Sequence, residues 1–322
     1  MSNTIVTLTA NPSLDRTLRL PGPLERGNVA RLGVSRTEPG GKGVNVARAA
    51  HLAAIPTRAV LPADAGDPVL AGLDALGLPY ENIPTGSPVR ANLTLTEADG
   101  TTSKFNEPGA TLDPEQVEAC VNELATASRG ADWVALCGSL PPGAPVDWYA
   151  QLVTALRPLG VKIAIDTSDA PLQALAAALP DAAPDLIKPN SEELGQLVGV
   201  DGLALEAQAE RGNWTPVVEA ARTLTELGIG AVLVTLGGAG ALLVTARGGW
   251  LATPPPTTVV STVGAGDSAL TGYLLAEREG LDAPERLRRA VAYGSAAAGL
   301  PGSQLPSPGE ANLDAVSVTP LG

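Results

Sequence analysis

The sequence predicts an α/β fold in which a mostly parallel sheet is covered by helices on both faces. Short β-branched runs alternate along the chain with longer helical stretches, which is the spacing of strand–helix–strand units. Hydrophobic residues make up 44% of the 322 residues, enough for a sizeable core. The middle strands are followed by Gly, Pro or Asn. Because ligands of such sheets bind beyond the carboxyl ends of the strands, we expect the functional site in those loops.

The alternation predicts seven strands and seven helices. The predicted strands are Ile5–Leu8, Arg58–Leu61, Trp133–Cys137, Val161–Asp166, Leu186–Lys188, Ala231–Leu236 and Ala241–Thr245. The predicted helices are Val44–Ala54, Pro114–Ser128, Val146–Leu156, Ser191–Val198, Pro216–Leu227, Asp267–Glu279 and Pro284–Ala298. Strands separated in this way by helices favour parallel pairing with both faces of the sheet covered.

Two segments interrupt the alternation and predict a small β-sheet lid. Residues 12–38 are irregular and rich in Pro, Gly and Arg. Residues 89–106 alternate apolar with polar side chains and turn at Asp99-Gly100, which predicts a hairpin. We predict a single domain over residues 1–322, with this lid attached and with residues 199–215 as a surface excursion.

The predicted hairpin has one apolar face, because Ala91, Leu93 and Leu95 alternate with polar residues. A thin sheet of few strands cannot bury both of its faces within one chain. An exposed apolar face favours association, and a two-fold axis is the commonest closed symmetry. We therefore expect a homodimer joined through the lid.

The charge of the chain disfavours nucleic-acid binding. There are 21 basic and 34 acidic side chains, for a net charge of −13, whereas nucleic-acid binders carry a basic surface. Residues 1–110 hold ten basic and ten acidic groups, so all of the negative excess lies in residues 111–322. An anionic ligand is therefore expected against the first third of the chain.

Other residue counts exclude further classes. One histidine, His51, excludes metal sites that need two histidines. Cys120 and Cys137 make neither a disulfide framework nor a zinc cluster. No apolar run approaches the ~18–20 residues that span a bilayer, and residues 1–10 lack the pattern of a secretory signal. We expect a cytoplasmic protein that binds no membrane.

A glycine loop, Ser261-Thr-Val-Gly-Ala-Gly-Asp-Ser268, precedes a predicted helix. The amides of residues 264–267 would point at an anion at the helix N-terminus. Asp267 in this turn is either a helix cap or a base. The loop also matches a variant of the dinucleotide fingerprint G-x-G-x-x-A, so a nicotinamide-dependent dehydrogenase is an alternative. The late position of the loop argues against it.

A second glycine loop, Pro39-Gly-Gly-Lys-Gly-Val-Asn-Val-Ala47, also precedes a helix. It is no P-loop, because Gly43 rather than Ser or Thr follows Lys42. Lys42 is one of only four lysines, and Asn45 lies about one helical turn after it, so both side chains can reach one ligand. The alternative is a flexible turn with a solvated lysine.

Two further loops follow predicted strands. In Lys188-Pro-Asn-Ser-Glu-Glu193, Asn190 and Glu193 form either a capping box or oxygen ligands near a hydrated Mg²⁺, with equal weight. Thr235-Leu-Gly-Gly-Ala-Gly240 joins two strands as a tight hairpin, and its glycines also allow a nucleotide to lie against the backbone.

Five motifs in this order resemble those of the ribokinase-like (PfkB) carbohydrate kinases. They are Thr9-Ala-Asn-Pro-Ser-Leu-Asp15, Gly40-Gly-Lys-Gly-Val-Asn-Val-Ala-Arg48, Gly138-Ser-Leu-Pro-Pro-Gly143, Lys188-Pro-Asn-Ser-Glu-Glu-Leu194 and Ser261–Ser268. The second and the last resemble the two signatures of that family, and the motifs cover the chain nearly end to end. The resemblance implies a ribokinase-like three-layer α/β/α sandwich and an ATP-dependent, Mg²⁺-using sugar kinase.

Within that family the chain resembles the 1-phosphofructokinase branch. The opening Asn11-Pro-Ser-Leu-Asp15, Arg90-Ala-Asn92 and Phe105-Asn-Glu-Pro-Gly109 favour this branch over ribokinase or adenosine kinase. The resemblance implies phosphorylation of fructose 1-phosphate to fructose 1,6-bisphosphate. Tagatose-6-phosphate kinase and 6-phosphofructokinase of the same family are the alternatives.

The resemblance also implies roles for individual residues. Asp267 would accept the proton of the attacking hydroxyl, and the amides of Gly264, Ala265 and Gly266 would hold the transferred phosphoryl group. The implied sugar-phosphate side is Asp15, Gly40, Gly41, Lys42, Asn45, Arg90, Lys104, Asn106 and Ser139. The implied nucleotide side is Lys188, Asn190, Thr235, Gly237, Gly238 and Gly240, with Asn190 and Glu193 organising Mg²⁺.

The chain departs from the family pattern in two places. Residues 61–72 lack the glycine-rich sequence typical of the sugar loop, and residues 199–215 are longer than usual. A non-catalytic sugar-phosphate-binding regulator with the same fold is a further alternative. Asp267 and the glycines around it are intact, which argues against that alternative.

Overall fold

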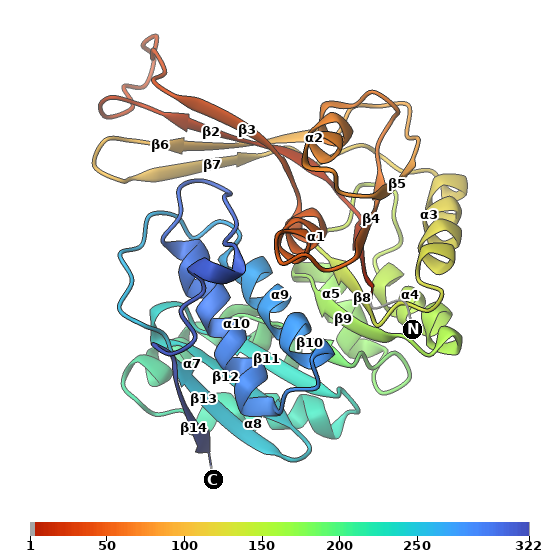
Figure 1. The fold of residues 1–322 in the computed structure, drawn as a ribbon, viewed down its shortest axis with the longest axis vertical. Helices are drawn as coiled ribbons and strands as arrows, with labels where there is room; N and C mark the ends of the chain where they lie inside the picture. Colours follow the sequence, from red (N-terminus) through yellow and green to blue (C-terminus); the bar gives the residue numbers. More distant parts are fainter. Residues whose placement is uncertain (1–3, 322) are drawn as a thin grey trace.

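The structure is a computed structural model that describes residues 4–321 (Figure 1). The strands of its main sheet are β1 (Ile5–Thr9), β4 (Thr57–Pro62), β5 (Tyr80–Ile83), β8 (Trp133–Cys137), β9 (Lys162–Asp166), β10 (Leu186–Ile187), β11 (Ala231–Thr235), β12 (Ala241–Thr245), β13 (Gly248–Thr253) and β14 (Ser317–Leu321). A second sheet contains β2 (Ser13–Arg19), β3 (Ser35–Gly40), β6 (Arg90–Thr96) and β7 (Thr102–Asn106).

Helices fill most of the connections between strands. They are α1 (Lys42–Leu52), α2 (Pro68–Leu76), α3 (Pro114–Ala127), α4 (Trp148–Leu156), α5 (Asp169–Ala177), α6 (Ser191–Val198), α7 (Gly202–Glu210), α8 (Thr215–Glu226), α9 (Ala265–Arg278) and α10 (Ala283–Ala298). All seven predicted strands and all seven predicted helices are present, with ends that shift by one or two residues. Among residues 4–321, no helix is long and apolar enough to cross a membrane.

The main sheet is parallel over most of its width, as predicted. Its strand order is β14-β13-β12-β11-β10-β9-β8-β1-β4-β5, and the strands from β11 to β5 are parallel. The last three strands, β12 to β14, run antiparallel to their neighbours. Every residue of β1 and of β8 is buried, because helices cover both faces of a parallel sheet.

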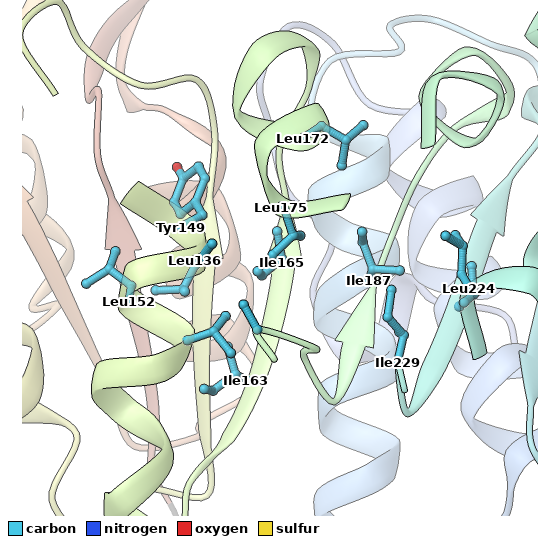
Figure 2. Packing of buried hydrophobic residues seen from close by; sticks show 14 of the residues in the cluster. Leu136, Tyr149, Leu152, Ile163, Ile165, Leu172, Leu175, Ile187, Leu224 and Ile229 are labelled. Carbon is cyan, nitrogen blue, oxygen red and sulfur yellow. The ribbon is translucent and has the colours of Figure 1, made fainter. Parts of the chain in front are cut away.

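Alternate residues of each strand pack into two different helical layers, which gives the three-layer sandwich. On one face, Leu136 and Ile165 pack with residues of α3 to α8. Figure 2 shows members of this cluster from β8, β9 and β10 facing helices α4 and α5. On the other face, Cys137 and Ala164 pack with residues of α1, α9 and α10. The period of two along each strand separates the two cores.

The second sheet has the order β3-β2-β6-β7 and projects from one end of the molecule (Figure 1). The predicted hairpin is confirmed, since β6 and β7 pair antiparallel around the turn at Gly100, where φ is 92°. Residues 12–38 contribute to this sheet, as predicted for the lid: they contain β2 and most of β3, and the part between these strands, residues 20–34, is irregular. Strand β2 pairs with β3 and, in parallel, with β6. Neighbouring strands, rather than local propensity, stabilise these two segments.

The segment 199–215 is more regular than predicted, because it contains α7. Asp201 caps this helix by accepting from the amides of Leu203 and Ala204, and Leu205 and Ala209 are buried against the main core. In residues 61–72, the end of β4 leads into α2, whose N-cap is Asp67. Both segments therefore belong to the packed part of the fold.

Candidate active site

The predicted site residues gather where the carboxyl ends of the central strands meet three helix N-termini. Helix α1 begins directly after Gly41, α6 after Asn190 and α9 after Gly264. Gly41 and Gly264 have φ values of 103° and 75°, a conformation that a residue with a Cβ rarely adopts. The glycines of the two predicted loops therefore set the start of both helices.

Asp267 lies in the first turn of α9 and is buried. Its Oδ2 accepts a hydrogen bond of 2.8 Å from Nδ2 of Asn45, 222 residues earlier in the chain. Gly264, not Asp267, occupies the cap position of this helix. Of the two readings of Asp267 left open by the sequence, a helix cap or a base, the cap is therefore wrong.

A buried carboxylate between two ammonium groups forms the centre of the site. Asp166, the last residue of β9, is fully buried. Nζ of Lys42 lies 2.8 Å from its Oδ1, and Nζ of the buried Lys188 lies 3.1 Å from its Oδ2. Sequence reasoning missed Asp166. Its signal was its place at the end of a predicted strand, where the other site residues also lie.

The charges of this cluster shift each other's pKa values. Burial raises the pKa of Asp267 above its ordinary value of 3.8; Asp166 adds to this, while Lys42 and the hydrogen bond from Asn45 oppose it. Burial alone would raise the pKa of Asp166 as well, but Lys188 and Lys42 hold it below its ordinary value. Burial also acts to lower the pKa of Lys42, yet Asp166 and Asp267 raise it overall. At neutral pH, Asp166 and Lys42 are therefore charged.

The N-terminus of α9 lies beside Lys188. The first amides of a helix have no partner within it, and the helix dipole places partial positive charge there. A Cβ on Gly266 would lie 3.2 Å from Nζ of Lys188, so the glycine lets this ammonium group approach the helix. The Ala265 amide makes only a long turn contact, 3.4 Å to the carbonyl of Thr262. Gly264, Ala265 and Gly266 thus lie where an anionic group would meet both the helix and Lys188.

The second sheet contributes a cluster of polar side chains around Asp15 of β2. Oδ1 of Asp15 accepts from Ser13 at 2.8 Å and from Nδ2 of Asn92 at 3.1 Å. A Cβ on Gly40 would lie 2.3 Å from Cγ of Asp15, so only a glycine allows this close approach. Oδ1 of Asn92 is buried without a hydrogen-bond partner among residues 4–321, which leaves it available to a ligand.

Arg90 begins β6 beside this cluster. Its two terminal nitrogens donate to the backbone carbonyls of Asn11 and Glu107, each at 3.2 Å. Burial lowers the pKa of the guanidinium, and the carboxylate of Asp15 opposes that shift. Within the described residues its Nε is buried and unpartnered. A positively charged donor that is held in place and incompletely paired fits an anionic group.

The structure places the remaining predicted sugar-side residues near the same sheet or at the end of β8. Lys104 and Asn106 are exposed on the edge strand β7, opposite Thr94 and Asn92. They face the same side of the sheet as Asp15, because directly paired residues share a face. Ser139 follows Gly138, where a Cβ would lie 3.9 Å from Cβ of Lys42.

Four of the six predicted nucleotide residues line a cavity of about 480 Å³ beside α9, whereas Lys188 and Asn190 lie outside its lining. Its lining includes Thr235, Gly237, Gly238, Gly240, Gly266, Pro254–Thr257 and small residues of α10 such as Ala290, Gly294 and Ala298. Sequence reasoning found the glycines but missed the α10 residues, because a stripe of small residues on a helix is equally typical of close helix packing.

Asn190 and Glu193 form the capping box that the sequence allowed. Oδ1 of Asn190 accepts from the amide of Glu193 at 2.8 Å, and Oε2 of Glu193 accepts from the amide of Asn190 at 2.9 Å. Asn190 also pairs with Thr235 in an isolated bridge, which joins this turn to the cavity. Burial and the nearby Asp166 raise the pKa of Glu193. The box engages Oε2 of Glu193 and leaves its Oε1 for a hydrated metal ion, whereas Oδ1 of Asn190, its only side-chain oxygen, keeps one further lone pair.

Comparisons with known proteins agree with this architecture. Residues 9–310 match the model of the family described as "pfkB family carbohydrate kinase". The chain is 37% identical to a 1-phosphofructokinase of Rhodobacter capsulatus, covering 96% of this chain and 94% of the relative. It is 32% identical to an ATP-dependent 6-phosphofructokinase isozyme 2 of Mycobacterium tuberculosis, covering 93% and 85%.

Solved structures agree as well. The structure of phosphofructokinase-2 from Escherichia coli in complex with substrates and products superimposes with a TM-score of 0.84 at 31% identity, over 95% of this chain and 96% of that one. The family match spans both glycine loops and every strand from β2 to β13. The chain therefore belongs to the pfkB family of carbohydrate kinases.

Proposed function

We propose that this protein transfers the γ-phosphoryl group of ATP to the C6 hydroxyl of fructose 1-phosphate, giving fructose 1,6-bisphosphate and ADP. The observation that carries the proposal is the position of Asp267. It lies buried at the N-terminus of α9, between the polar face of the second sheet and the glycine-lined cavity. Relatives named 1-phosphofructokinase support the choice of sugar phosphate.

The sugar phosphate binds between the second sheet and the start of α1. Asp15 and Asn45 accept from or donate to sugar hydroxyls, and Arg90 and Lys42 supply positive charge for the phosphate. The sugar-phosphate site also includes Lys104, Asn106 and Ser139. The backbone can approach the ligand closely at Gly40 and Gly41. Support comes from the unpartnered Nε of Arg90 and Oδ1 of Asn92, which both lie in this region. The charge balance of residues 1–110 agrees with an anionic ligand here.

ATP occupies the cavity of about 480 Å³ with its phosphates toward Gly266 and Lys188. The cavity lining supplies backbone amides and small side chains, which suit close contact with a nucleotide base and ribose. Thr235 and the three glycines after it lie at one wall, and Ala290 and Gly294 of α10 lie at another.

Phosphoryl transfer depends mainly on positioning and on charge stabilisation. Asp267 accepts the proton of the attacking hydroxyl as the new O–P bond forms and the bond to ADP breaks. The amides of Gly264, Ala265 and Gly266, together with Lys188, stabilise the charge on the transferred group. Lys42 balances Asp166 and Asp267, so that the site is not repulsive to two anionic substrates.

Mg²⁺ fits this site as an ion shared with ATP. Among residues 4–321, no group of three or more His, Cys, Asp or Glu side chains could hold a metal ion, so the protein offers no cage of its own. Mg²⁺ retains several waters and binds through one or two protein oxygens plus substrate phosphates, which the Asn190 and Glu193 oxygens can supply. When bound, the ion would neutralise phosphate charge.

A coupled ADP-release assay tests the proposal. Fructose 1-phosphate, fructose 6-phosphate and tagatose 6-phosphate are compared at equal concentrations, and fructose 1-phosphate is expected to give the highest kcat/KM. A clear preference for fructose 6-phosphate would indicate a 6-phosphofructokinase instead. A clear preference for tagatose 6-phosphate would indicate a tagatose-6-phosphate kinase. If none of the three sugar phosphates causes ADP release, the alternative of a non-catalytic sugar-phosphate-binding regulator is favoured.

The dehydrogenase alternative loses its structural basis. Its fingerprint loop must follow a strand directly, whereas residues 254–264 separate β13 from α9. Nicotinamide cofactors are accordingly expected not to support any reaction.

We also propose a cytoplasmic homodimer joined through the apolar face of the second sheet, which we call the lid. Phe105 lies opposite Leu93 on this face and is 53% exposed. The polar face carries Asp15 and Glu38 and turns toward the site. A cytoplasmic location agrees with ATP as donor and with two free, buried cysteines.

A further inference from the structure

A chain of polar side chains runs from the lid strand β3 to Asp267. Ser303 donates to Oε2 of Glu38 at 2.7 Å, and Nη2 of Arg48 donates to Oε1 of Glu38 at 3.1 Å. Nη1 of Arg48 donates to the carbonyl of Pro39 at 2.9 Å and to Oδ1 of Asn45 at 3.4 Å. Asn45 then donates to Asp267. The roles proposed above use only the last two of these residues.

The chemistry of Arg48 determines which way the Asn45 amide points. A guanidinium has N–H donors and no acceptor, so the atom of Asn45 that faces it must be the oxygen. The amide nitrogen of Asn45 is then the atom that faces Asp267. The reversed amide would direct N–H groups at Arg48 and a carbonyl oxygen at the Asp267 carboxylate, and both contacts are repulsive. Arg48 and Asn45 are both buried, so water cannot easily replace these bonds.

The other end of the chain belongs to the lid and to the segment after α10. Glu38 and Pro39 lie in β3, and Ser303 lies in the segment that reaches up to the lid in Figure 1. A Cβ on Gly302 would lie 3.0 Å from Oγ1 of Thr17 in β2, so this segment touches two lid strands. Ser261, in the loop before α9, donates to the carbonyl of Gly302 at 2.8 Å.

We propose that Arg48 is a positioning residue that fixes the Asn45 amide against Asp267 only while lid strand β3 is in place. Two lid groups, the Glu38 carboxylate and the Pro39 carbonyl, hold the guanidinium. When β3 moves away, Arg48 loses these partners and the orientation of Asn45 is no longer set. The base is thus completed by lid closure, which limits attack by water on ATP in the open state. This inference rests on the proposed function of Asp267.

The test compares Arg48→Met and Glu38→Gln with wild type in the ADP-release assay from pH 5 to pH 9. Both variants are expected to lower kcat by about 10- to 100-fold, the scale of a misplaced catalytic group, with little change in KM for ATP. Glu38→Gln keeps the side-chain shape and removes only the charge that holds Arg48. Arg58→Met is the matched control, because Arg58 also pairs with a glutamate, Glu81, but on the exposed edge of the main sheet.

The pH profile separates positioning from a general loss of structure. Asp267 faces Lys42 and Asn45 from α1, Asp166 from β9 and Lys188 from the turn after β10. Of these, only the bond from Asn45 depends on Arg48. Its loss removes a donor to the carboxylate, raises the pKa of Asp267 and moves the acid limb of the kcat profile to higher pH. Melting temperatures, measured alongside, report structural damage.

A double-mutant cycle with Asn45→Ala shows whether Arg48 acts on Asp267 through Asn45. If Arg48 acts through Asn45, Arg48→Met added to Asn45→Ala causes no further loss of kcat. Fully additive losses, or a kcat of Arg48→Met within two-fold of wild type, would overturn the proposal. If Arg48→Met does not fold, Arg48→Lys takes its place, because lysine keeps the charge but cannot hold three acceptors in one plane.

The outcomes also distinguish this inference from the proposed function. An active wild type with an unaffected Arg48 variant overturns the link to the lid alone. A wild type that phosphorylates none of the sugar phosphates overturns both.

Discussion

At the scale of single residues, Asp267 combines burial with a single fixed hydrogen bond. Asp267 is 6% exposed. The neutral amide of Asn45 donates the hydrogen bond to its carboxylate. A carboxylate in this position keeps enough basicity to accept a proton, because burial raises its pKa. The site therefore needs no histidine, which agrees with the single His51 of the chain.

Replacing Asp267 by Asn tests its role as the base. The amide has nearly the same shape but cannot accept the proton, so turnover is expected to fall by at least ~100-fold. ATP affinity and melting temperature should stay close to wild type. Single-turnover kinetics and nucleotide titration measure these quantities, and near-wild-type turnover would remove Asp267 from the mechanism.

The pH dependence of kcat follows from the same environment. Asp267 must be ionised to act, and its pKa is raised by burial, so the rate falls with decreasing pH through a value above the ordinary 3.8. Asn45→Ala removes a hydrogen bond to the ionised form, and its acid limb is expected at still higher pH. An acid limb that stays in place in this variant would show that another group controls the profile.

Substitution of Arg90 or Lys42 tests the proposed binding site for the sugar phosphate. Arg90→Ala and Lys42→Ala each remove a cation, and a charge-assisted hydrogen bond contributes ~1.5–3 kcal/mol, or roughly 10- to 100-fold in KM for the sugar phosphate. KM for ATP should change less. Arg157→Ala, which removes an exposed ion pair with Asp185, is the control. If KM for ATP rises instead, the two subsites have been assigned in reverse.

Asp166 shows what the sequence could not reveal at this scale. Its place at the end of a predicted strand was visible in the sequence, but nothing near it in the sequence singled it out as a site residue. Its partners Lys42 and Lys188 come from two other elements, the former 124 residues away. Only the parallel order of the strands brings the three together, and that order is a property of the whole sheet.

At the scale of elements, the start of α6 is placed for two purposes, a helix cap and the metal role proposed above. Its capping box is complete, so Asn190 and Glu193 stabilise the helix whether or not they contact a metal. Asn190 also pairs with Thr235, which lines the cavity proposed for ATP. The two readings that the sequence left open are therefore compatible.

Asn190→Ala and Glu193→Ala separate the two purposes. Loss of a cap alone costs about 1 kcal/mol and lowers the melting temperature. A metal role predicts in addition that more Mg²⁺ is needed for half-maximal rate, while KM for the sugar phosphate is unchanged. Asp201→Ala, which removes the cap of α7, is the matched control. A lower melting temperature with an unchanged Mg²⁺ titration would leave only the cap.

The elements that sequence analysis found are those with strong apolar runs. Buried strands such as β1 and β8 stand out, because both of their faces are covered. Helices α2, α5 and α7 were missed. The sequences of α5 and α7 are alanine-rich with little periodicity, and α2 is a short apolar segment, which periodicity alone does not assign to a helix or a strand. Strand β14 was missed because it contains Pro320, which is tolerated only at the edge of the sheet.

At the scale of the whole molecule, the lid has a polar face and an apolar face. Glu38 and Thr17 on the polar face contact the segment after α10, so the part of this face on β2 and β3 is packed within one chain. On the other face Leu95 is already buried, whereas Phe105 is 53% exposed. The sequence predicted the apolar face from its alternation. It did not predict the parallel pairing of β2 with β6 that completes the sheet.

A homodimer through this apolar face is expected in solution. Light scattering at micromolar concentration should give about twice 32.5 kDa. Phe105→Asp should shift the protein toward monomer and lower its activity, because the lid loses support. Val200→Asp, a change of similar exposure between α6 and α7, should do neither. A monomeric wild type with an unaffected Phe105→Asp variant would contradict this assembly.

The position of β7 at the edge of the lid also has a consequence for local stability. Most residues of β7 are exposed, whereas every residue of β1 is buried between two parallel neighbours. Local opening costs least where few apolar contacts are broken, so this edge of the lid is expected to be among the first parts to open in the native state. Amide hydrogen exchange should accordingly be faster in β7 than in β1. Substrate bound against β2 and β6 would slow that exchange and so make a part that opens early one of the most protected.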